Sequence, residues 1–201
     1  GTDTEKIHSL KQMYLNNVIP NAHLYDAKTS IYDLAATTFQ PLMLREHFRC
    51  VPDIIGFSNF LSYDYKIKPL RDESSSNLFP AVVNYRVSNG ERIGKTNPAE
   101  ARAIVALMRA CMEQPEYQGK TFGIISLLGD EQVKILQTEL DRHIDPQEST
   151  NRHILCGNAA NFQGDERDVI FLSLVDCAND GGPVSKQGDG QGDAYKKRYN
   201  A

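Results

Sequence analysis

The chain has 201 residues, 40% apolar and 24% charged, which suits one globular domain or a large part of a longer protein. Its 22 lysines and arginines are outnumbered by 26 aspartates and glutamates, and the resulting charge of −4 excludes a general basic field for nucleic acid. No apolar run reaches the roughly 18 residues that cross a bilayer, and the N-terminus does not resemble a signal peptide. We therefore expect a cytoplasmic protein with no membrane partner.

The cysteines favour core positions over a disulfide or metal framework. The four cysteines are Cys50, Cys111, Cys156 and Cys177. They lie at least 21 positions apart, and three of them have apolar neighbours. We expect no bound metal ion on this part of the chain.

Residues 1–40 have the pattern of a helical leader, with one helix carrying Ile7 and Leu10 on a stripe and a second, short helix around 31–35. We expect this leader to pack on the domain that follows. Residues 41–46 then predict a short strand, and Pro52 begins a helix. Alternating apolar residues in 81–87, followed by Asn89-Gly90, predict a small antiparallel hairpin as an appendage.

The helix with the clearest signals begins at Asn97, which can cap it together with Glu100 in a capping box, and it ends before Pro115. Residues 121–128 form a continuous apolar run of strand length, and a helix capped by Asp130 follows.

Two further apolar strands are expected at 153–156 and 169–175. Strands that are apolar on both sides and alternate with amphipathic helices predict an α/β fold, a parallel sheet with helices on both faces, over residues 41–176.

The remaining residues, 177–201, are rich in glycine and aspartate, and we expect a mobile loop there. Lys196-Lys197-Arg198 then opens what looks like a new element, so we expect this chain to be part of a longer protein.

Two polar loops are candidates for chemistry. Residues 44–52 crowd charged side chains between a strand and a helix, and 158–168 connect two apolar strands. In the second loop, Gly164 allows a phosphate to approach the backbone, Gln163 can orient a phosphate oxygen or a water, and Glu166 can accept from ribose hydroxyls. A hydrated turn with local ion pairs is the structural alternative for both loops.

LREHFRCVPDI (44–54) and NAANFQGDERDVIFLSLV (158–175) resemble two motifs of superfamily 1 helicases, with consensus QYRMHPxI and TVDxFQGxExDVVILS. TFGIISLLGDEQ (121–132) is similar to the strand and loop between them, and KKRYNA (196–201) to the start of the family's next motif. The resemblance is to the C-terminal RecA-like domain, of the P-loop NTPase type, in the branch of the nonsense-decay and Okazaki-fragment helicases.

The resemblance implies a role for six residues. Arg49 would contact the γ-phosphate of ATP, Gln163 and Gly164 would line the phosphates, and Glu166 would hold the ribose. Ser126 and Asn158 would contact the backbone of single-stranded DNA or RNA.

The chain departs from the family at Ala160, where the second motif has aspartate, and at Glu46 to Phe48, which replace glutamine and tyrosine. No GxxxxGK[ST] loop is present, because GERIGKT (90–96) has the wrong spacing. The first RecA-like domain of the parent protein would supply that loop and most of the Mg²⁺ ligands.

Two other classes stay open. One is a small doubly wound nucleotide or phosphosugar enzyme with Glu166 or His47 as general acid or base. The other is a non-catalytic nucleic-acid or protein interaction module that retains a RecA-like fold.

Overall fold

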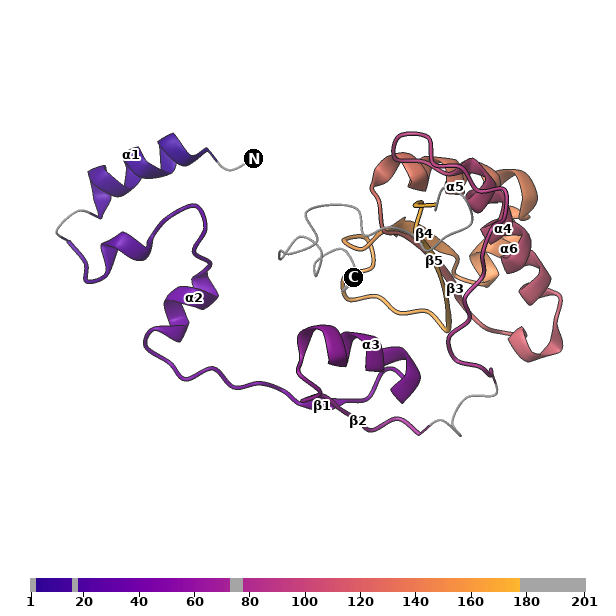
Figure 1. Ribbon diagram of the computed structural model, residues 1–201, viewed down its shortest axis with the longest axis horizontal. Helices are drawn as coiled ribbons and strands as arrows, with labels where there is room; N and C mark the ends of the chain where they lie inside the picture. Colours follow the sequence, from indigo (N-terminus) through magenta and orange to yellow (C-terminus); the bar gives the residue numbers. More distant parts are fainter. Residues whose placement is uncertain (1–2, 16–17, 73–77, 178–201) are drawn as a thin grey trace. The chain divides into compact units, whose positions relative to one another are not determined.

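The computed structural model describes residues 3–15, 18–72 and 78–177. The chain divides into two compact units, residues 1–45 and 46–201, and each is described by itself (Figure 1). The predicted Gly/Asp-rich loop and the basic triplet of 196–198 fall outside the described residues.

The first unit contains α1 (Thr4–Tyr14), a 3₁₀ turn η1 (Ala22–Leu24) and α2 (Ile31–Ala36). Both helices begin at a side-chain cap: Asp3 accepts from the Lys6 amide at 3.0 Å, and Ser30 forms a reciprocal capping box with Asp33. The two predicted helices of the leader are confirmed, and its packing against the following domain stays a prediction.

The second unit opens with two short parallel strands, β1 (Glu46–His47) and β2 (Lys68–Pro69), joined by α3 (Pro52–Ser62). The helix predicted to start at Pro52 is confirmed. The strand predicted at 41–46 is wrong for 41–45, which form no strand, because these residues have no partner strand and Leu42 and Leu44 remain exposed.

A three-stranded parallel sheet forms the centre of this unit, in the order β4 (Leu155–Asn158), β3 (Phe122–Ser126), β5 (Val169–Ser173). Its helices are α4 (Pro98–Met112), α5 (Asp130–His143) and the short α6 (Pro146–Asn151), with a 3₁₀ turn η3 (Pro115–Tyr117) after α4. The predicted α/β class with a parallel sheet is confirmed.

The helices α4 and α5 lie on one side of this sheet (Figure 1), and the buried core is formed between these helices and β3. It consists of Ala101, Ile104, Val105, Met108, Phe122, Ile124, Leu136, Leu140 and Ile144. On the opposite face, Phe162 from the β4–β5 connection packs over Gly123, while Ile170 and Leu172 are 38% and 53% exposed. Among the described residues, the helices that build the core therefore cover one face.

The predicted hairpin is wrong, because residues 81–87 form no strand. The turn itself is present, since the Gly90 amide donates to the Val87 carbonyl at 3.1 Å. Val83 and Tyr85 are 70% and 64% exposed, so the alternation has no partner strand and no core to face.

Two predicted helix caps also differ. The cap of α5 is Gly129, whose φ of 95° turns the chain into the helix, and Asp130 instead accepts a hydrogen bond from Asn158 at 2.8 Å. At α4, Asn97 caps the Glu100 amide as predicted, but the Glu100 carboxylate does not complete the capping box. It accepts from the Ser173 hydroxyl and from the two amides that follow β5.

Gln132 accepts the hydrogen bond from the Asn97 amide that Glu100 would accept in a capping box. Its side chain is fully buried, accepts from the Asn97 amide at 2.8 Å, and donates to the Asn97 carbonyl at 3.2 Å and the Ser173 hydroxyl at 3.1 Å. A single amide group thus joins the first turn of α5, the start of α4 and the end of β5.

At the other end of the sheet, Asp168 fixes the entry to β5. Its carboxylate accepts from the Thr121 amide and hydroxyl at 2.9 and 2.8 Å. Partial burial raises the pKa of Asp168, but these bonds, with the charges of Lys120 and Arg71, lower the pKa below its ordinary value overall.

We expect Gln132→Leu to lower the free energy of unfolding by about 1–3 kcal/mol, because it leaves the buried Asn97 amide without an acceptor and removes one hydrogen bond each from the Asn97 carbonyl and the Ser173 hydroxyl. Urea denaturation measures the loss. Gln137→Leu, on the exposed side of the same helix, is the matched control and should change stability by less than about 0.5 kcal/mol. Equal losses in the two variants would contradict this account.

We expect the free energy of unfolding of Asp168→Asn to depend less on pH in the acid range than that of the wild type. A depressed carboxyl pKa contributes stability above the unfolded value of about 3.9, and that contribution is lost as the pH falls through the lower folded pKa. Wild type should therefore lose its advantage over Asp168→Asn as the pH drops below about 4. Parallel curves measured by thermal unfolding from pH 7 downwards would count against this role for Asp168.

Candidate functional site

The parallel register separates the predicted site residues into two groups. Ser126 is paired with Asn158 on one side and with Ser173 on the other, so all three lie at the carboxyl ends of their strands. Glu166 lies two residues before Asp168, which is bonded to the residue preceding β3, and so it lies toward the amino ends. The 159–168 connection therefore runs from one end of the sheet to the other.

This connection begins with a tight polar turn. Asn158 accepts from the Ala160 amide at 2.9 Å, and the Asn161 side chain accepts from the Asn158 amide at 2.9 Å. A Cβ on Gly157 would lie 2.7 Å from Asn161, so a glycine is required for this close approach. Phe162, 9% exposed, then anchors the chain on β3.

After Phe162 the chain turns outward through Gly164. Its φ of 83° favours glycine, and no atom lies within 4 Å of the place where its Cβ would be. Gln163 and Glu166 are exposed on either side of it. The turn is therefore open to a group approaching from solvent, as a phosphate-lining role would require.

Arg167 holds the far side of this turn. Its guanidinium donates to the His153 carbonyl at 2.7 Å and to the Asp165 carboxylate, and the bond to Asp165 lowers the pKa of that carboxyl. Because Arg167 and Asp165 satisfy each other, the exposed side chains of Gln163 and Glu166 are the ones in this turn that can meet other groups.

Arg49 meets this turn from a distant part of the chain. Its Nε lies 3.0 Å from Glu166 Oε2, and the two side chains are 57% and 70% exposed. Arg49 and Glu166, which the family resemblance assigns to the same nucleotide, therefore lie beside each other and are partly exposed.

The backbone around Arg49 is fixed by three contacts. Its carbonyl accepts from Arg71 Nη1 at 2.6 Å, the Leu70 amide donates to the His47 carbonyl at 2.8 Å, and the Cys50 amide donates to His47 Nε2 at 3.0 Å. The last bond requires His47 Nε2 to carry no proton, so His47 acts here as a backbone acceptor. Burial raises the pKa of the Cys50 thiol, and the charges of Arg49 and Arg71 oppose that rise.

The two side chains predicted to contact a nucleic-acid strand instead form hydrogen bonds within the protein. Ser126 is only 2% exposed, and its hydroxyl donates to the Gly129 carbonyl at 3.1 Å. The Asn158 amide nitrogen donates to Asp130. Both side chains shape the loops 127–129 and 159–161, and it is these loops that carry the more exposed surface at this end of the sheet.

Sequence reasoning missed three residues that organise the site: Glu100, Gln132 and Arg71. Glu100 looked like a capping-box residue, yet it holds the chain after β5, and burial raises its pKa above the ordinary value although Ser173, Leu174 and Val175 donate to it. The signal for Gln132 was a polar residue on the inward side of a helix. Arg71 carried no local signal.

Two histidine–cysteine pairs have a spacing of three, but neither is arranged as a metal site. His47 accepts from the Cys50 backbone, and Cys156 lies against the Val133 carbonyl, where burial raises its pKa to about 12. Within the described ranges, no three histidine, cysteine or acidic side chains are grouped to hold a metal ion. A search of the same residues finds no helix with the length and apolarity for a membrane span.

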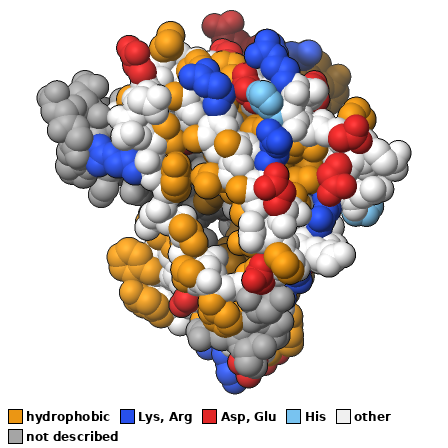
Figure 2. Space-filling model, turned by 90° about the vertical axis from the view of Figure 1, so that its right-hand side faces the viewer, with side chains coloured by type: hydrophobic (Ala, Val, Ile, Leu, Met, Phe, Trp, Pro, Cys, Tyr) orange, Lys and Arg blue, Asp and Glu red, His pale blue; other side chains and the backbone are white. Residues whose placement is uncertain are grey.

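The surface shows charge of both signs. Among the side chains coloured in Figure 2, basic and acidic groups are interspersed.

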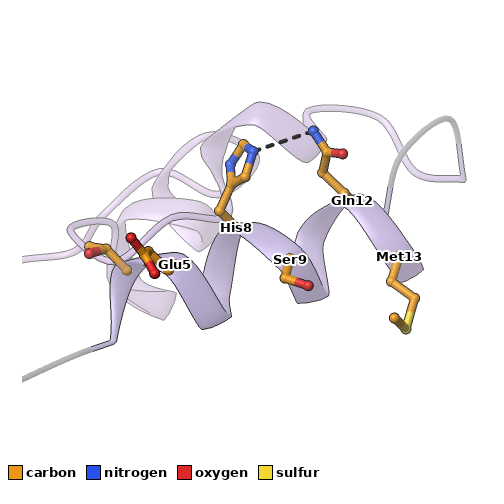
Figure 3. Close-up of a pocket in the computed structure, with 6 residues that line it drawn as sticks. Glu5, His8, Ser9, Gln12 and Met13 are labelled. Atoms are coloured by element: carbon orange, nitrogen blue, oxygen red, sulfur yellow. Dashed lines mark hydrogen bonds between the residues drawn. The ribbon is translucent and has the colours of Figure 1, made fainter.

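The pocket on α1 is lined by Thr4, Glu5, His8, Ser9, Gln12 and Met13, with His8 Nε2 and Gln12 Nε2 3.3 Å apart (Figure 3). It contains none of the predicted site residues, and it lies on one face of a single helix.

Comparison with known proteins agrees with the fold. Residues 27–188 match the family described as the AAA domain. An uncharacterized ATP-dependent helicase of Mycoplasma pneumoniae, the MG140 homolog, is 26% identical over 159 residues, and MG140 of Mycoplasma genitalium is 27% identical over the same length. These matches cover 73% of this chain but only 14% of each relative, so the chain spans about one seventh of their length. The chain belongs to the AAA domain family and has a RecA-like α/β fold of the P-loop NTPase type.

Proposed function

We propose that this chain is the second RecA-like motor domain of an ATP-dependent superfamily 1 helicase, in the branch of the nonsense-decay and Okazaki-fragment helicases. The observation that carries the proposal is the contact of Arg49 with Glu166 at 3.0 Å, since it joins two motifs more than 100 residues apart. The helicase names of the two relatives support the same class.

The Arg49 end of the unit is the proposed nucleotide edge. The residues fit a polyphosphate: Arg49 offers a planar, permanently charged donor, and the open side of Gly164 gives access to the backbone. Arg49 would bind the γ-phosphate of ATP, Gln163 and Gly164 would line the phosphates, and Glu166 would accept from the ribose. ATP with Mg²⁺ supplies the phosphoryl group, and an arginine that meets it can raise the rate by several powers of ten.

The carboxyl ends of the strands form the proposed strand edge. Ser126 and Asn158 hold the loops 127–129 and 159–161, whose backbone would contact single-stranded DNA or RNA. Neutral donors suit a domain with a net charge of −4. The first RecA-like domain of the parent would face the nucleotide edge, and closing of the cleft between the two domains would move the strand, 5′ to 3′ by family resemblance.

An interaction module without ATP chemistry is the second candidate. It is favoured by the exposed Ile170 and Leu172 on the open side of the sheet, which suit a protein partner. The contact of Arg49 with Glu166 joins the two motifs that carry the helicase resemblance, so the motor domain remains the stronger proposal.

We expect the isolated chain to hydrolyse no ATP, because it contains no GxxxxGK[ST] loop. Phosphate release should stay at the blank rate with or without single-stranded DNA or RNA, while thermal unfolding remains cooperative. If this chain hydrolysed ATP and Arg49→Ala abolished that hydrolysis, the chain would instead be a small doubly wound nucleotide enzyme.

In the full-length parent we expect Arg49→Ala to reduce ATP hydrolysis by at least about a hundredfold while single-strand affinity changes less than about twofold. Asn158→Ala should do the reverse: it should weaken strand binding and the stimulation of ATPase by single strands, while basal hydrolysis persists. ATPase assays and fluorescence titrations across salt concentrations measure both. If Arg49→Ala lost strand affinity as strongly as Asn158→Ala, the separation of the two edges would be refuted.

A further inference from the structure

Arg49 is held at both ends by charged residues. Glu166 contacts its Nε at 3.0 Å, and Arg71 donates to its backbone carbonyl at 2.6 Å. The two partners come from different parts of the chain, since Arg71 follows β2 and Glu166 lies in the β4–β5 connection.

The Glu166 contact leaves the outer side of the guanidinium available. A guanidinium has five N–H donors in a flat fork, and the ion pair with Glu166 lies on its Nε side, with 3.0 Å between Nε and Oε2. The two terminal nitrogens can therefore still meet a phosphate in the bidentate geometry that arginine favours. A carboxylate beside Nε favours the side-chain conformations that keep Nε close to it, so it biases the direction in which these nitrogens face.

The Arg71 contact acts on the backbone. Arg71 is 22 residues from Arg49, and the bond ties the chain after β2 to the chain after β1. A charged donor on a carbonyl gives a stronger hydrogen bond than a neutral one. The Arg71 charge also acts on Cys50, where it opposes the rise in pKa caused by burial, and on Asp168, whose pKa it helps to lower.

We infer that Arg71 and Glu166 are positioning residues for Arg49, holding its backbone and its Nε so that its terminal nitrogens are presented to a polyphosphate. The inference rests on the proposed role of Arg49 and adds which residues orient its guanidinium group. It concerns ligands that carry linked phosphates, such as inorganic tripolyphosphate or the phosphate chain of ATP.

A residue that acts through Arg49 is recognised by a double-mutant cycle. We expect Arg71→Ala to weaken tripolyphosphate binding by about threefold to tenfold in the wild-type chain and to have no further effect when Arg49 is already alanine. Glu166→Ala should behave in the same way, and Glu166→Gln should retain most of the affinity because its amide oxygen, which carries partial negative charge, can still lie beside Nε. Arg102→Ala on the exposed side of α4 is the control for loss of one positive charge.

The titrations use the chain as it is, with tripolyphosphate at millimolar concentrations followed by ¹H–¹⁵N spectra. The Arg49 Nε–H signal gives a second measurement that needs no ligand. Its chemical shift should change in Arg71→Ala and Glu166→Ala and stay close to that of the wild-type chain in Glu166→Gln and Arg102→Ala. Unchanged amide signals elsewhere will verify that each variant is folded.

Additive effects of Arg71→Ala and Arg49→Ala would overturn the inference, because Arg71 would then contact the anion independently or act as a general charge. Tighter binding by Glu166→Gln would overturn it too, since Glu166 would then be a competitor for Arg49. If the wild-type chain binds no tripolyphosphate, the inference is also wrong, and the ATPase of the full-length parent still tests the proposed function separately.

Discussion

The parallel pairing of β3 with both of its neighbours is the constraint on which the other features depend. All five residues of β3 are buried, so the strand has no freedom to shift its register without moving the core. Because β4 and β5 run in the same direction as β3, their carboxyl ends gather Ser126, Asn158 and Ser173 at one end of the sheet. The connection from β4 to β5 must then cross the full length of the sheet, and this crossing lets one loop serve both proposed edges.

A network of buried polar groups turns the carboxyl end of the sheet into a rigid junction. Gln132 joins α5 to α4 and β5, and Glu100 binds the chain that leaves β5. This chain includes Val175, a fully buried β-branched residue at a φ of 66°, a strained conformation that persists only where the surroundings enforce it. Such a junction suits a domain that moves as one body, because displacement is then confined to its boundary with a partner domain.

Local patterns predicted the elements that depend on local physics. Pro52 and Asn97 start helices where the sequence indicates, and the apolar runs after Lys120 and Asp168 are strands, the first fully buried in the centre of the sheet and the second beside it at the edge. Two predictions that needed a distant partner were wrong. Residues 81–87 alternate like a strand but pair with none, and Glu100 leaves its helix cap for amides more than 70 residues away. The proximity of Arg49 and Glu166 could be expected only from the family resemblance, which assigns both residues to the same nucleotide. The rule that sites lie at the carboxyl ends of strands would have assigned Glu166 to the wrong end of the sheet.

The strength of the Arg49–Glu166 pair bears on how the proposed site can work. An exposed ion pair is worth about 0.2–1 kcal/mol, because water screens the charges and two long side chains lose freedom. A contact this weak does not lock the arginine, whereas charge-assisted bonds to a phosphate are stronger and can redirect it. The pair can therefore orient Arg49 before a ligand arrives and yield to that ligand at little cost. In the proposed motor domain, such a site would acquire its full geometry only when the phosphates and the surface that carries them are present.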